Sequence, residues 1–530
     1  MMVKTNTKFQ TADPSRVSEI SKKYHVGKLA SELLAGSGLN DAQIAEMCTG
    51  DDRIADSNAD CIVAARDRIM KAKANHEKVF VGGDYDADGM TSTAIMKYTL
   101  DALGIENGYY IPNRDKDGYG LQPGIVELAV RKGYTLFITV DNGVSAQEAI
   151  SAVHAHGLDI IVTDHQDITA PVGADILVHP TVLEPSRYSL SGAGVALLLS
   201  RALIGQRDNI DLLAGVAAVT DLMPMWGDAR RLVKRAIHTG PGAVPVIADL
   251  CGGAKAFNEE TIGFQVGPRL NSVGRLNDPA MSVNAVPKAL LSTDPAQASV
   301  CAGIMTDLNN VRKDMTAHLA ESAEKFVTPD MGIIAIYDPD IPKGVCGIVA
   351  GQITEKYHKP SIVLSGKNEI TGSARSTSNF NIKEYLDGWE HFTRFGGHPM
   401  AAGMSMTEAD VPAFIDYCRK AVVPAAVDGT SALLVDPDAL TVTNIDELDT
   451  LRPFPKDMNT LIAIPWPEKA DVKQYPKVTK ICFPQGLEAV FFPQHSPITI
   501  PEHPAYITGR VSINEWNDRR SVQILVEDII

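Results

Sequence analysis

The chain has 530 residues, of which 45% are hydrophobic and 22% charged, a composition typical of soluble globular proteins with several domains. No apolar run approaches the roughly 18 residues that a membrane-spanning helix needs, and residues 1–10 have neither a signal-peptide core nor a transit pattern, so we expect a cytoplasmic protein without membrane contact. The formal net charge of −16 argues against a protein that coats nucleic acid through an overall positive surface, but it leaves room for an enzyme with a local basic groove.

The cysteines give no sign of a metal ribbon or a disulfide framework. Seven cysteines are scattered singly along the chain, and none forms a pair separated by two residues. We therefore interpret them as reduced thiols.

In the first part of the chain, the sequence predicts a helical extension followed by a parallel-sheet domain. Residues 1–75 are polar and helix-prone. Continuous apolar runs then alternate with helical stretches, which is typical of buried parallel strands. The runs are residues 79–81, 136–140 and 160–162, and the helical stretches are residues 90–103, 145–156, 195–203 and 212–222. We assign this α/β domain to residues 76–290.

The rest of the chain predicts three further parts. A stretch with few helix breakers indicates a connecting helix within residues 291–330. A second α/β domain follows over residues 331–425, with a glycine-rich turn at Gly396 and Gly397. After a linker at 424–431, proline density and alternating patterns favour a small β-barrel-like domain over residues 430–530.

An acidic turn directly follows the first predicted strand. Asp84, Asp86 and Asp88 occupy every second position there. Three anions this close repel one another unless a cation lies among them, and hard divalent cations are the natural partner. A solvated acidic loop is the plain alternative. A calcium loop is disfavoured because Ile95 stands where that motif needs an acidic residue.

Further candidate ligands lie at the ends of the next elements. Asp141 closes the second strand, Asp164 and His165 close the third, and Asp221 lies in a very apolar stretch. Taken singly, His165 fits a core or surface histidine and Asp221 fits the last turn of a helix. Because the carboxyl ends of parallel strands meet at one edge, the set together predicts a two-metal site.

These segments resemble the four motifs of the DHH phosphoesterases in the form found in the RecJ family: residues 83–89, 139–143, 162–166 and 218–221. Downstream, residues 267–275, 372–376, 396–403 and 509–523 resemble RecJ substrate-binding, DHH-associated and oligonucleotide-binding segments. The resemblance runs from about residue 75 to residue 530. It departs from the family at Gln166, where a second histidine is usual, and at residues 342–347, which lack a histidine before a Gly-Val pair.

The resemblance implies a metal-dependent exonuclease that hydrolyses single-stranded DNA from the 5′ end to mononucleotides, in recombination, repair or replication. Two Mn²⁺ or Mg²⁺ ions would be held by Asp86, Asp88, Asp141, His165 and Asp221, with Asp84 close by and Asp141 as the bridging ligand. Single-stranded DNA is then the partner, with a single-strand-binding protein or a helicase as further candidates.

The resemblance also implies substrate contacts. Those expected are Asp164, Gln166, Arg269, Asn271, Arg275, Ser373, Arg375, Ser376, His398, Trp516 and Arg519. Among them Ser373, Arg375 and Ser376 form a candidate pocket for a 5′ phosphate, and Trp516 with Arg519 would stack bases and hold phosphates. The structural alternatives are arginines that cap helices, a turn histidine at His398 and an exposed hairpin tip at Trp516.

Two other functions compete with this one. Another DHH phosphodiesterase, acting on small nucleotides or short oligonucleotides, would share the first two domains, but the C-terminal domain favours a longer polymer. A non-catalytic replication scaffold would have lost metal ligands, whereas every acidic ligand position is filled here.

Overall fold

The computed structural model describes residues 7–114, 116–118, 120–424, 431–475, 478–484, 486–492, 500–516 and 519–530, apart from the side chain of Trp516. The chain divides into two compact units, one of Asp52–Ala426 and one that combines Met1–Asp51 with Val427–Ile530. Most of the expected linker at 424–431 lies outside the described residues. None of the described helices has the length and apolar character that crossing a membrane requires.

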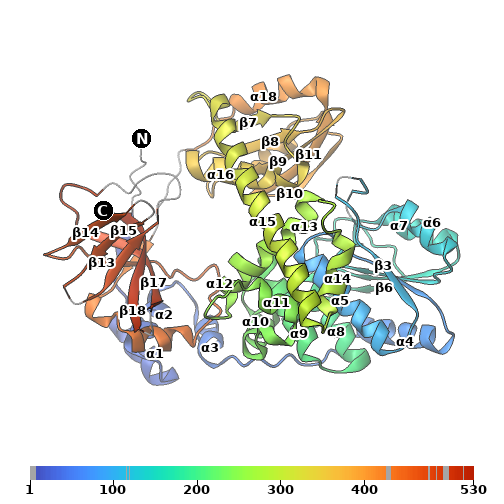
Figure 1. Cartoon of the computed structure of the whole chain (residues 1–530), viewed down its shortest axis with the longest axis horizontal. Helices are drawn as coiled ribbons and strands as arrows, with labels where there is room; N and C mark the ends of the chain where they lie inside the picture. Colours follow the sequence, from blue (N-terminus) through green and yellow to red (C-terminus); the bar gives the residue numbers. More distant parts are fainter. Residues whose placement is uncertain are drawn as a thin grey trace. The chain divides into compact units, whose positions relative to one another are not determined.

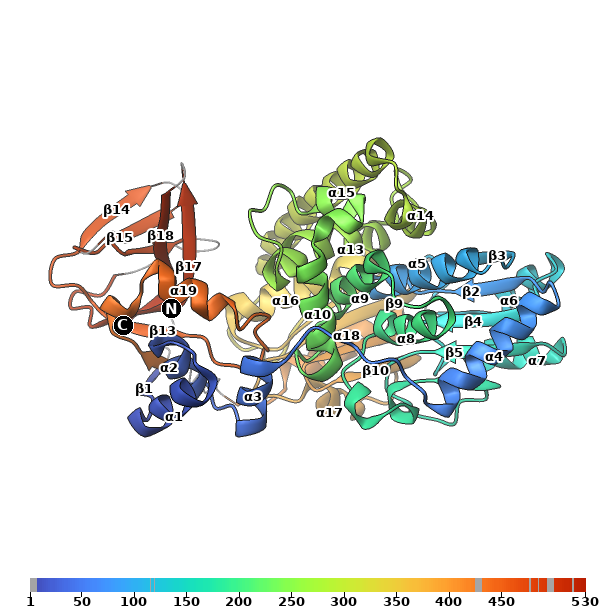
Figure 2. The ribbon, with the colours of Figure 1, turned by 90° about the horizontal axis from the view of Figure 1, so that it is seen from below.

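A five-stranded parallel sheet lies at the centre of the first α/β domain (Figure 2). Its strand order is β3 (Asn107–Tyr110), β2 (Val79–Gly82), β4 (Leu136–Val140), β5 (Asp159–Thr163) and β6 (Ile176–Val178). The three predicted strands are confirmed as its central members, β2, β4 and β5.

Helices cover both faces of this sheet, because the strand residues are apolar on both sides. Val79 and Val81 belong to one core with α4 (Asp60–Ala74), α5 (Ala87–Ala102) and α8 (Gly192–Ile204). Phe80 and Phe137 belong to a second core, with α6 (Pro123–Arg131) and α7 (Gln147–Ala155). Near-continuous apolar strands of this kind are what a doubly covered parallel sheet requires.

A helical region follows the sheet and ends in one long helix. Its members are α9 (Asp208–Thr220), α10 (Gly227–Thr239), α11 (Pro245–Leu250), α12 (Glu259–Thr261), the π-helix η4 (Ile262–Val266), α13 (Gly267–Leu276), α14 (Val286–Leu291) and α15 (Pro295–Ala323). Helix α15 has 29 residues and confirms the predicted connecting helix. It leads to the second α/β domain (Figure 1).

The second α/β domain contains a mixed five-stranded sheet. The order is β10 (Arg394–His398), β11 (Ala401–Thr407), β9 (Glu369–Arg375), β8 (Ser361–Ser365) and β7 (Ile334–Tyr337), with α16 (Cys346–Tyr357), α17 (Ile382–Asp387) and α18 (Val411–Arg419). The glycine-rich turn predicted at Gly396 and Gly397 is wrong, because both residues pair with β11 inside β10. A Cβ on Gly397 would lie 2.4 Å from the Ala401 carbonyl oxygen, so the glycine serves close strand approach rather than a turn.

The smaller unit is built on a mixed eight-stranded sheet, which agrees with the β-rich C-terminal domain expected from the sequence. The strand order is β1 (Lys8–Gln10), β12 (Ser431–Leu434), β13 (Ile462–Pro465), β17 (Tyr506–Trp516), β18 (Arg519–Ile529), β16 (Glu488–Phe491), β15 (Val478–Cys482) and β14 (Asp471–Tyr475). Its helices are α1 (Pro14–Tyr24), α2 (Lys28–Gly36), α3 (Asp41–Thr49) and α19 (Val442–Asp449).

The N-terminal residues therefore do not form one separate extension. Strand β1 pairs in parallel with β12, and the Gly27 backbone N–H donates to Glu447 Oε1 at 2.6 Å, so this segment belongs to the smaller unit. Helix α4, within the same expected extension, packs instead on the parallel sheet.

A buried ion pair fastens α8 to α9. Arg201 donates from Nη2 at 2.7 Å and from Nε at 3.2 Å to Asp211 Oδ1, and Arg235 donates from Nε to Asp211 Oδ2 at 3.3 Å. Asp211 is wholly buried. Removing one partner of such a pair leaves an uncompensated charge in the interior.

We expect Asp211→Ala to lower the free energy of unfolding of the larger unit by roughly 3–5 kcal/mol. Asp208→Ala, which removes an exposed partner of the same Arg235, is the matched control and should cost less than about 1 kcal/mol. Urea denaturation followed by circular dichroism measures both, and equal losses would contradict the dominance of the buried pair.

Candidate metal centre

The carboxyl ends of β2, β4 and β5 bring the predicted ligands to one place. Asp141 directly follows β4, His165 follows β5, and Asp221 is the residue that ends α9. His165 Nε2 lies 3.2 Å from Asp141 Oδ1, 3.5 Å from Asp221 Oδ2 and 3.6 Å from Asp88 Oδ2. Residues from distant parts of the chain thus meet around one imidazole.

The candidate ligands form two adjoining groups. In each group one ligand atom per residue can be chosen so that all lie within 4.8 Å of one another; the groups are Asp88, His165 and Asp221, and Asp84, Asp86 and Asp141. Carboxylate oxygens with one imidazole nitrogen suit Mn²⁺ or Mg²⁺. Two neighbouring groups of three ligands fit a pair of such cations.

The electrostatics of the cluster favour a bound cation. Asp84, Asp88 and Asp141 are each at most 2% exposed. Burial raises the pKa of Asp84 and of Asp141 well above the ordinary value, and the neighbouring carboxylates Asp86 and Asp88, respectively, raise it further. Burial also raises the pKa of Asp88, against the opposing effect of His165. Asp84 Oδ1 has no hydrogen-bond partner among the described residues, as expected of an atom placed to bind a metal ion.

The start of helix α8 binds one of these carboxylates and packs closely against a second. The backbone N–H groups of Gly192 and Ala193, in its first turn, donate to the two oxygens of Asp88 at 2.8 Å. The positive end of a helix stabilises such an anion. A Cβ on Gly192 would lie 2.4 Å from Asp141 Oδ1, so only glycine lets the helix come this close.

Asp164 connects the loops that carry the ligands. Its Oδ1 accepts from the N–H groups of His165 at 2.7 Å and Gln166 at 3.2 Å, and its Oδ2 accepts from Val144 N–H at 3.0 Å. The side chain is completely buried. Both oxygens of Asp164 thus accept from the backbone, which gives this residue a structural role, and its expected substrate contact stays a prediction.

Gln166, the departure from the family pattern, is held through its backbone by a buried histidine. His179 Nε2 lies 2.9 Å from the Gln166 carbonyl oxygen, and His179 Nδ1 accepts from Thr181 N–H at 3.2 Å. Burial lowers the pKa of His179, which favours the neutral ring that donates from Nε2. The Gln166 side chain is half-buried.

Helix α13 presents its expected residues on different faces. Asn271 Oδ1 accepts from Ala87 N–H at 2.8 Å and so braces the acidic turn. Arg275 donates to the Gly344 carbonyl oxygen at 3.3 Å. Arg269, two residues before Asn271, instead donates to the Leu250 carbonyl oxygen at 2.6 Å, at the end of α11. The helix-capping alternative therefore describes Arg269.

Four arginines, Arg114, Arg275, Arg312 and Arg375, form what we call the arginine cluster. Burial is the largest cause that lowers the pKa of Arg275, and with the charges of the other three arginines, against the opposing effect of Asp86, it brings this pKa to about 10. None of the four forms an ion pair within the part of the chain that the structure describes. Such a concentration of cations, which the carboxylates of the acidic cluster affect without forming ion pairs, indicates a site for an anion.

Sequence reasoning missed Arg114 and Arg312. Arg312 lies in the middle of α15, and among the described residues its guanidinium donates to Asn309 Oδ1 alone, at 3.0 and 3.1 Å. Arg114 lies over the Tyr85 ring, 5.1 Å from its centroid. For Arg312 the sequence did contain a signal. No Asp or Glu lies three or four positions away, so this arginine cannot form an ion pair along its own helix.

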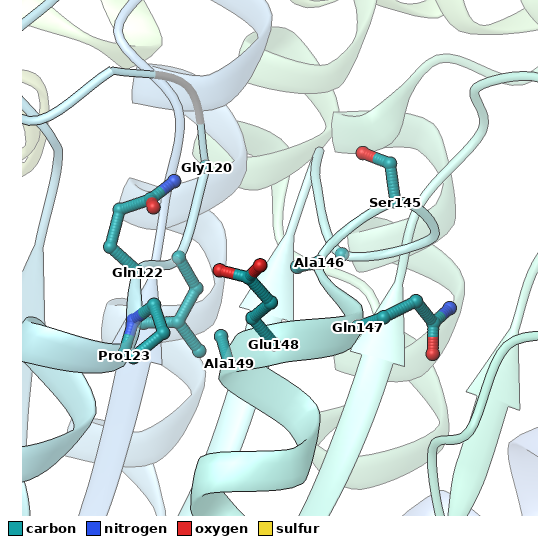
Figure 3. A pocket seen from close by; sticks show the side chains of 10 residues that line it. Gly120, Gln122, Pro123, Ser145, Ala146, Gln147, Glu148 and Ala149 are labelled. Carbon is teal, nitrogen blue, oxygen red and sulfur yellow. The ribbon is translucent and has the colours of Figure 1, made fainter.

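Two cavities near the ligands differ in charge. One, of about 200 Å³, is lined by Arg275, Arg312, Asn271 and Leu222 among others. The other, of about 320 Å³, lies between the first turns of α6 and α7, where Glu148 points inward (Figure 3). No lysine or arginine is among the residues that line this second cavity, so the first is the one suited to a polyanion.

The remaining expected contacts are only partly in place for a substrate. Ser373 Oγ lies 3.2 Å from Arg375 Nη1, whereas the Ser376 hydroxyl donates to the Phe380 carbonyl oxygen at 2.6 Å. His398 is exposed on β10. Arg519 is exposed on β18 of the smaller unit, and the side chain of Trp516 lies outside the described residues.

Comparison with known families gives two matches. Residues 78–220 match the DHH family, N-terminal domain, and residues 330–423 match the DHHA1 domain. The first range covers the parallel-sheet domain that carries most of the candidate metal ligands. The second covers the domain whose strand β9 carries Ser373 and Arg375.

The curated relatives carry one name. The chain is 31% identical over 563 aligned residues to the single-stranded-DNA-specific exonuclease RecJ of Bacillus subtilis (strain 168), covering 99% of this chain and 71% of the relative. It is 34% identical over 374 residues to the protein of that name from Escherichia coli (strain K12), covering 62% of this chain and 64% of the relative. The matched region is thus shorter than either relative.

Solved structures show the same architecture. The crystal structure of RecJ in complex with Mn²⁺ from Thermus thermophilus matches with a TM-score of 0.84 and 24% identity, over 100% of this chain and 80% of that chain. A crystal structure of exonuclease RecJ bound to manganese matches with a TM-score of 0.61 and 30% identity, over 69% of this chain and 95% of that chain.

The raised carboxylate pKa values predict how metal and pH act together. Without metal, the folded protein holds more protons on Asp84 and Asp141 than the unfolded chain does once the pH exceeds about 4, so its stability falls as the pH rises through their folded-state pKa values. A cation binds the deprotonated carboxylates and offsets this loss. We expect Mn²⁺ to raise the melting temperature in calorimetry, and to raise it more at about pH 8 than at about pH 6.

Asp141→Asn is the matched variant for this prediction. Asparagine tolerates the left-handed backbone of this position, where φ is 60°, and it has the same shape without the charge. Because repulsion is reduced, the variant should melt above the parent protein without metal and should gain less from Mn²⁺. A variant that melts lower without metal and keeps the full Mn²⁺ response would contradict the role of Asp141 in the cluster.

Proposed function

This chain belongs to the RecJ family of single-stranded-DNA-specific exonucleases, and we propose that it is a divalent-metal-dependent exonuclease that hydrolyses single-stranded DNA from the 5′ end to mononucleotides. The observation that carries the proposal is that two clusters of opposite charge lie near each other. Two adjoining groups of carboxylate and imidazole ligands, buried or half-buried, lie near four arginines that form no ion pair among the described residues. A phosphodiester backbone is an anion that such an arrangement can both bind and cut.

In this proposal Asp86, Asp88, Asp141, His165 and Asp221 hold two cations, with Asp84 alongside. When bound, the two cations supply positive charge to the phosphoryl oxygens and lower the pKa of water. Mn²⁺ is slightly favoured over Mg²⁺ because His165 offers nitrogen. The close contact of His165 with Asp88, Asp141 and Asp221 supports this ligand set.

The arginine cluster would bind the phosphates of the substrate. A pKa of about 10 keeps Arg275 cationic at neutral pH, although it is largely buried. Guanidinium groups offer paired donors to phosphate oxygens, and burial strengthens that interaction. Asn271 would act indirectly, because it holds the acidic turn through Ala87.

The 5′ polarity rests on the contacts around the start of α16. A Cβ on Gly347, in the first turn of this helix, would lie 2.8 Å from Arg375 Nη2 and 2.9 Å from Ser373 Oγ. Helix N–H groups, a guanidinium and a hydroxyl therefore converge on one point, which suits a terminal phosphate with its extra negative charge. We propose that Ser373 and Arg375 hold the 5′ phosphate there.

Two proposals concern the wider setting. The smaller unit, through Trp516 and Arg519, would hold the incoming strand, since aromatic and cationic side chains on a β-sheet bind single strands without sequence preference. A role in DNA recombination, repair or replication in the cytoplasm, with a single-strand-binding protein or a helicase as partner, rests on family membership alone.

Three labelled substrates test the proposed activity with Mn²⁺: a single strand with a 5′ phosphate, the same strand with a blocked 5′ end, and a blunt duplex. We expect rapid release of mononucleotides from the first alone, because the pocket at Arg375 requires a free terminal phosphate. Asp88→Ala is the inactive control, since it removes a metal ligand. Equal rates on the blocked strand, or shortening from the 3′ end, would rule out this polarity. Activity confined to oligonucleotides of a few nucleotides would instead favour a DHH phosphodiesterase that acts on short substrates.

Gln166 offers a second test. Gln166→His restores the family residue and should preserve or raise kcat, because an imidazole can donate a hydrogen bond to a phosphoryl oxygen and can also carry a proton. Gln166→Ala, which removes the donor, should lower kcat. Steady-state rates on the 5′-phosphorylated strand measure both variants, and a large loss in Gln166→His would mean that the local geometry requires glutamine.

A further inference from the structure

Two large apolar side chains are exposed beside the arginine-lined cavity. Leu222 is 63% exposed and Phe264 is 74% exposed. Leu222 directly follows Asp221 and lines the cavity, and Gly263, the neighbour of Phe264, lines the same cavity. Scattered exposed apolar residues are ordinary on a protein surface, but here one lines a cationic cavity next to a proposed metal ligand and the other directly follows a lining residue.

The backbone at both residues departs from regular structure. Leu222 has a φ of 60°, a conformation that costs a leucine energy and favours glycine or asparagine. Hydrogen bonds from Leu222 N–H to the Val219 carbonyl and from Met223 N–H to the Ala218 carbonyl, of 3.1 and 3.0 Å, hold this turn. Phe264 lies in the π-helix η4, a rare form that is found frequently at functional sites.

Packing brings the π-helix to the end of α9. A Cβ on Gly263 would lie 3.6 Å from Val219 Cγ1, and one on Gly267 would lie 2.7 Å from Thr220 Cγ2. The π-helix thus packs against the last turn of α9, which leads directly to Asp221 and Leu222. We call Leu222, which follows this turn, and Phe264, in the π-helix packed against it, the apolar rim.

The chemistry of the rim and of the cavity together matches a nucleotide. Arg275 and Arg312 line the cavity and form no ion pair among the described residues, so they offer charge to a phosphate. An apolar rim offers contact to the faces of a base, which stack on aromatic side chains whatever the base is. Two side chains around a charged cavity are too small a surface for a stable protein interface of about 800 Å² per partner.

We propose that Leu222 and Phe264 form a platform for a nucleobase of single-stranded DNA whose phosphate lies in the arginine-lined cavity. This proposal rests on the proposed exonuclease function and extends it to the recognition of a base beside the cleavage site. The platform contributes to substrate binding without sequence preference. Its loss raises KM and leaves kcat nearly unchanged, because neither residue supplies a group to the reaction.

The variants are chosen to preserve the fold. Phe264→Ala removes the aromatic face, and Phe264→Tyr keeps it as the conservative rescue. Leu222→Asn removes apolar area with a residue that tolerates the same positive φ. Phe326→Ala is the matched control, because Phe326 is 57% exposed and is not among the residues that line the cavity.

We expect Phe264→Ala to raise KM for single-stranded DNA about tenfold or more while kcat changes less than about twofold, with Phe264→Tyr near the parent protein. Leu222→Asn should raise KM in the same direction, and Phe326→Ala should change nothing. Fluorescence of 2-aminopurine near the 5′ end of an oligonucleotide should be quenched by the parent protein and less by Phe264→Ala, a readout that a purely structural role would not alter.

The outcomes separate this proposal from the proposed function. If the parent protein hydrolyses single-stranded DNA and Phe264→Ala has the same KM and the same quenching, the platform is overturned alone. If the parent protein binds the strand without cutting it, the exonuclease function fails, and the dissociation constants of parent and Phe264→Ala decide on the platform. If the parent protein does not bind the strand, both are overturned.

Discussion

The mutual repulsion of buried carboxylates is the constraint on which the rest of this structure depends. Asp84, Asp88 and Asp141 are nearly excluded from water, and burial raises the pKa of each. Burying several anions together is unfavourable unless protons or cations neutralise them. The fold accepts this cost at the carboxyl edge of its parallel sheet, the edge at which α/β proteins bind ligands.

Much of the surrounding structure serves to keep these groups together. The first turn of α8 binds both oxygens of Asp88, Asp164 ties the loop after β4 to the loop after β5, and Asn271 holds the acidic turn from α13. Gly274 lets α13 approach closely, because a Cβ there would lie 2.1 Å from the Tyr85 carbonyl oxygen. Helix starts, backbone N–H groups and small residues thus position the carboxylates, and of these positioning groups only Asp164 adds a further negative charge.

The arginine cluster explains how a chain with a net charge of −16 can bind a polyanion. Positive charge is concentrated where four arginines lack acidic partners among the described residues, and each lies close enough to affect the pKa of Arg275 or to share its cavity. A phosphate that enters the cavity at Arg275 and Arg312 meets cations close to the proposed metal ligands, since Leu222, which also lines the cavity, directly follows Asp221. Local arrangement of charge, rather than the total, therefore governs binding.

The sequence by itself determined the parallel strands β2, β4 and β5, the long helix α15 and the set of candidate ligands, because each follows from patterns only a few residues long. Apolar runs identify buried strands, and polar residues at strand ends must share one edge of the sheet.

What only the tertiary structure decided is the direction and partner of individual side chains. Asp164 accepts hydrogen bonds from the backbone, Arg269 donates to the end of α11, and Ser376 donates to Phe380, although the sequence made all three candidate substrate contacts. Arg114 and Arg312 join the arginine cluster from elements far apart in the chain, and β1 pairs with β12 from the opposite end of the sequence. Such contacts depend on how separate elements pack, and no short pattern in the sequence encodes that packing.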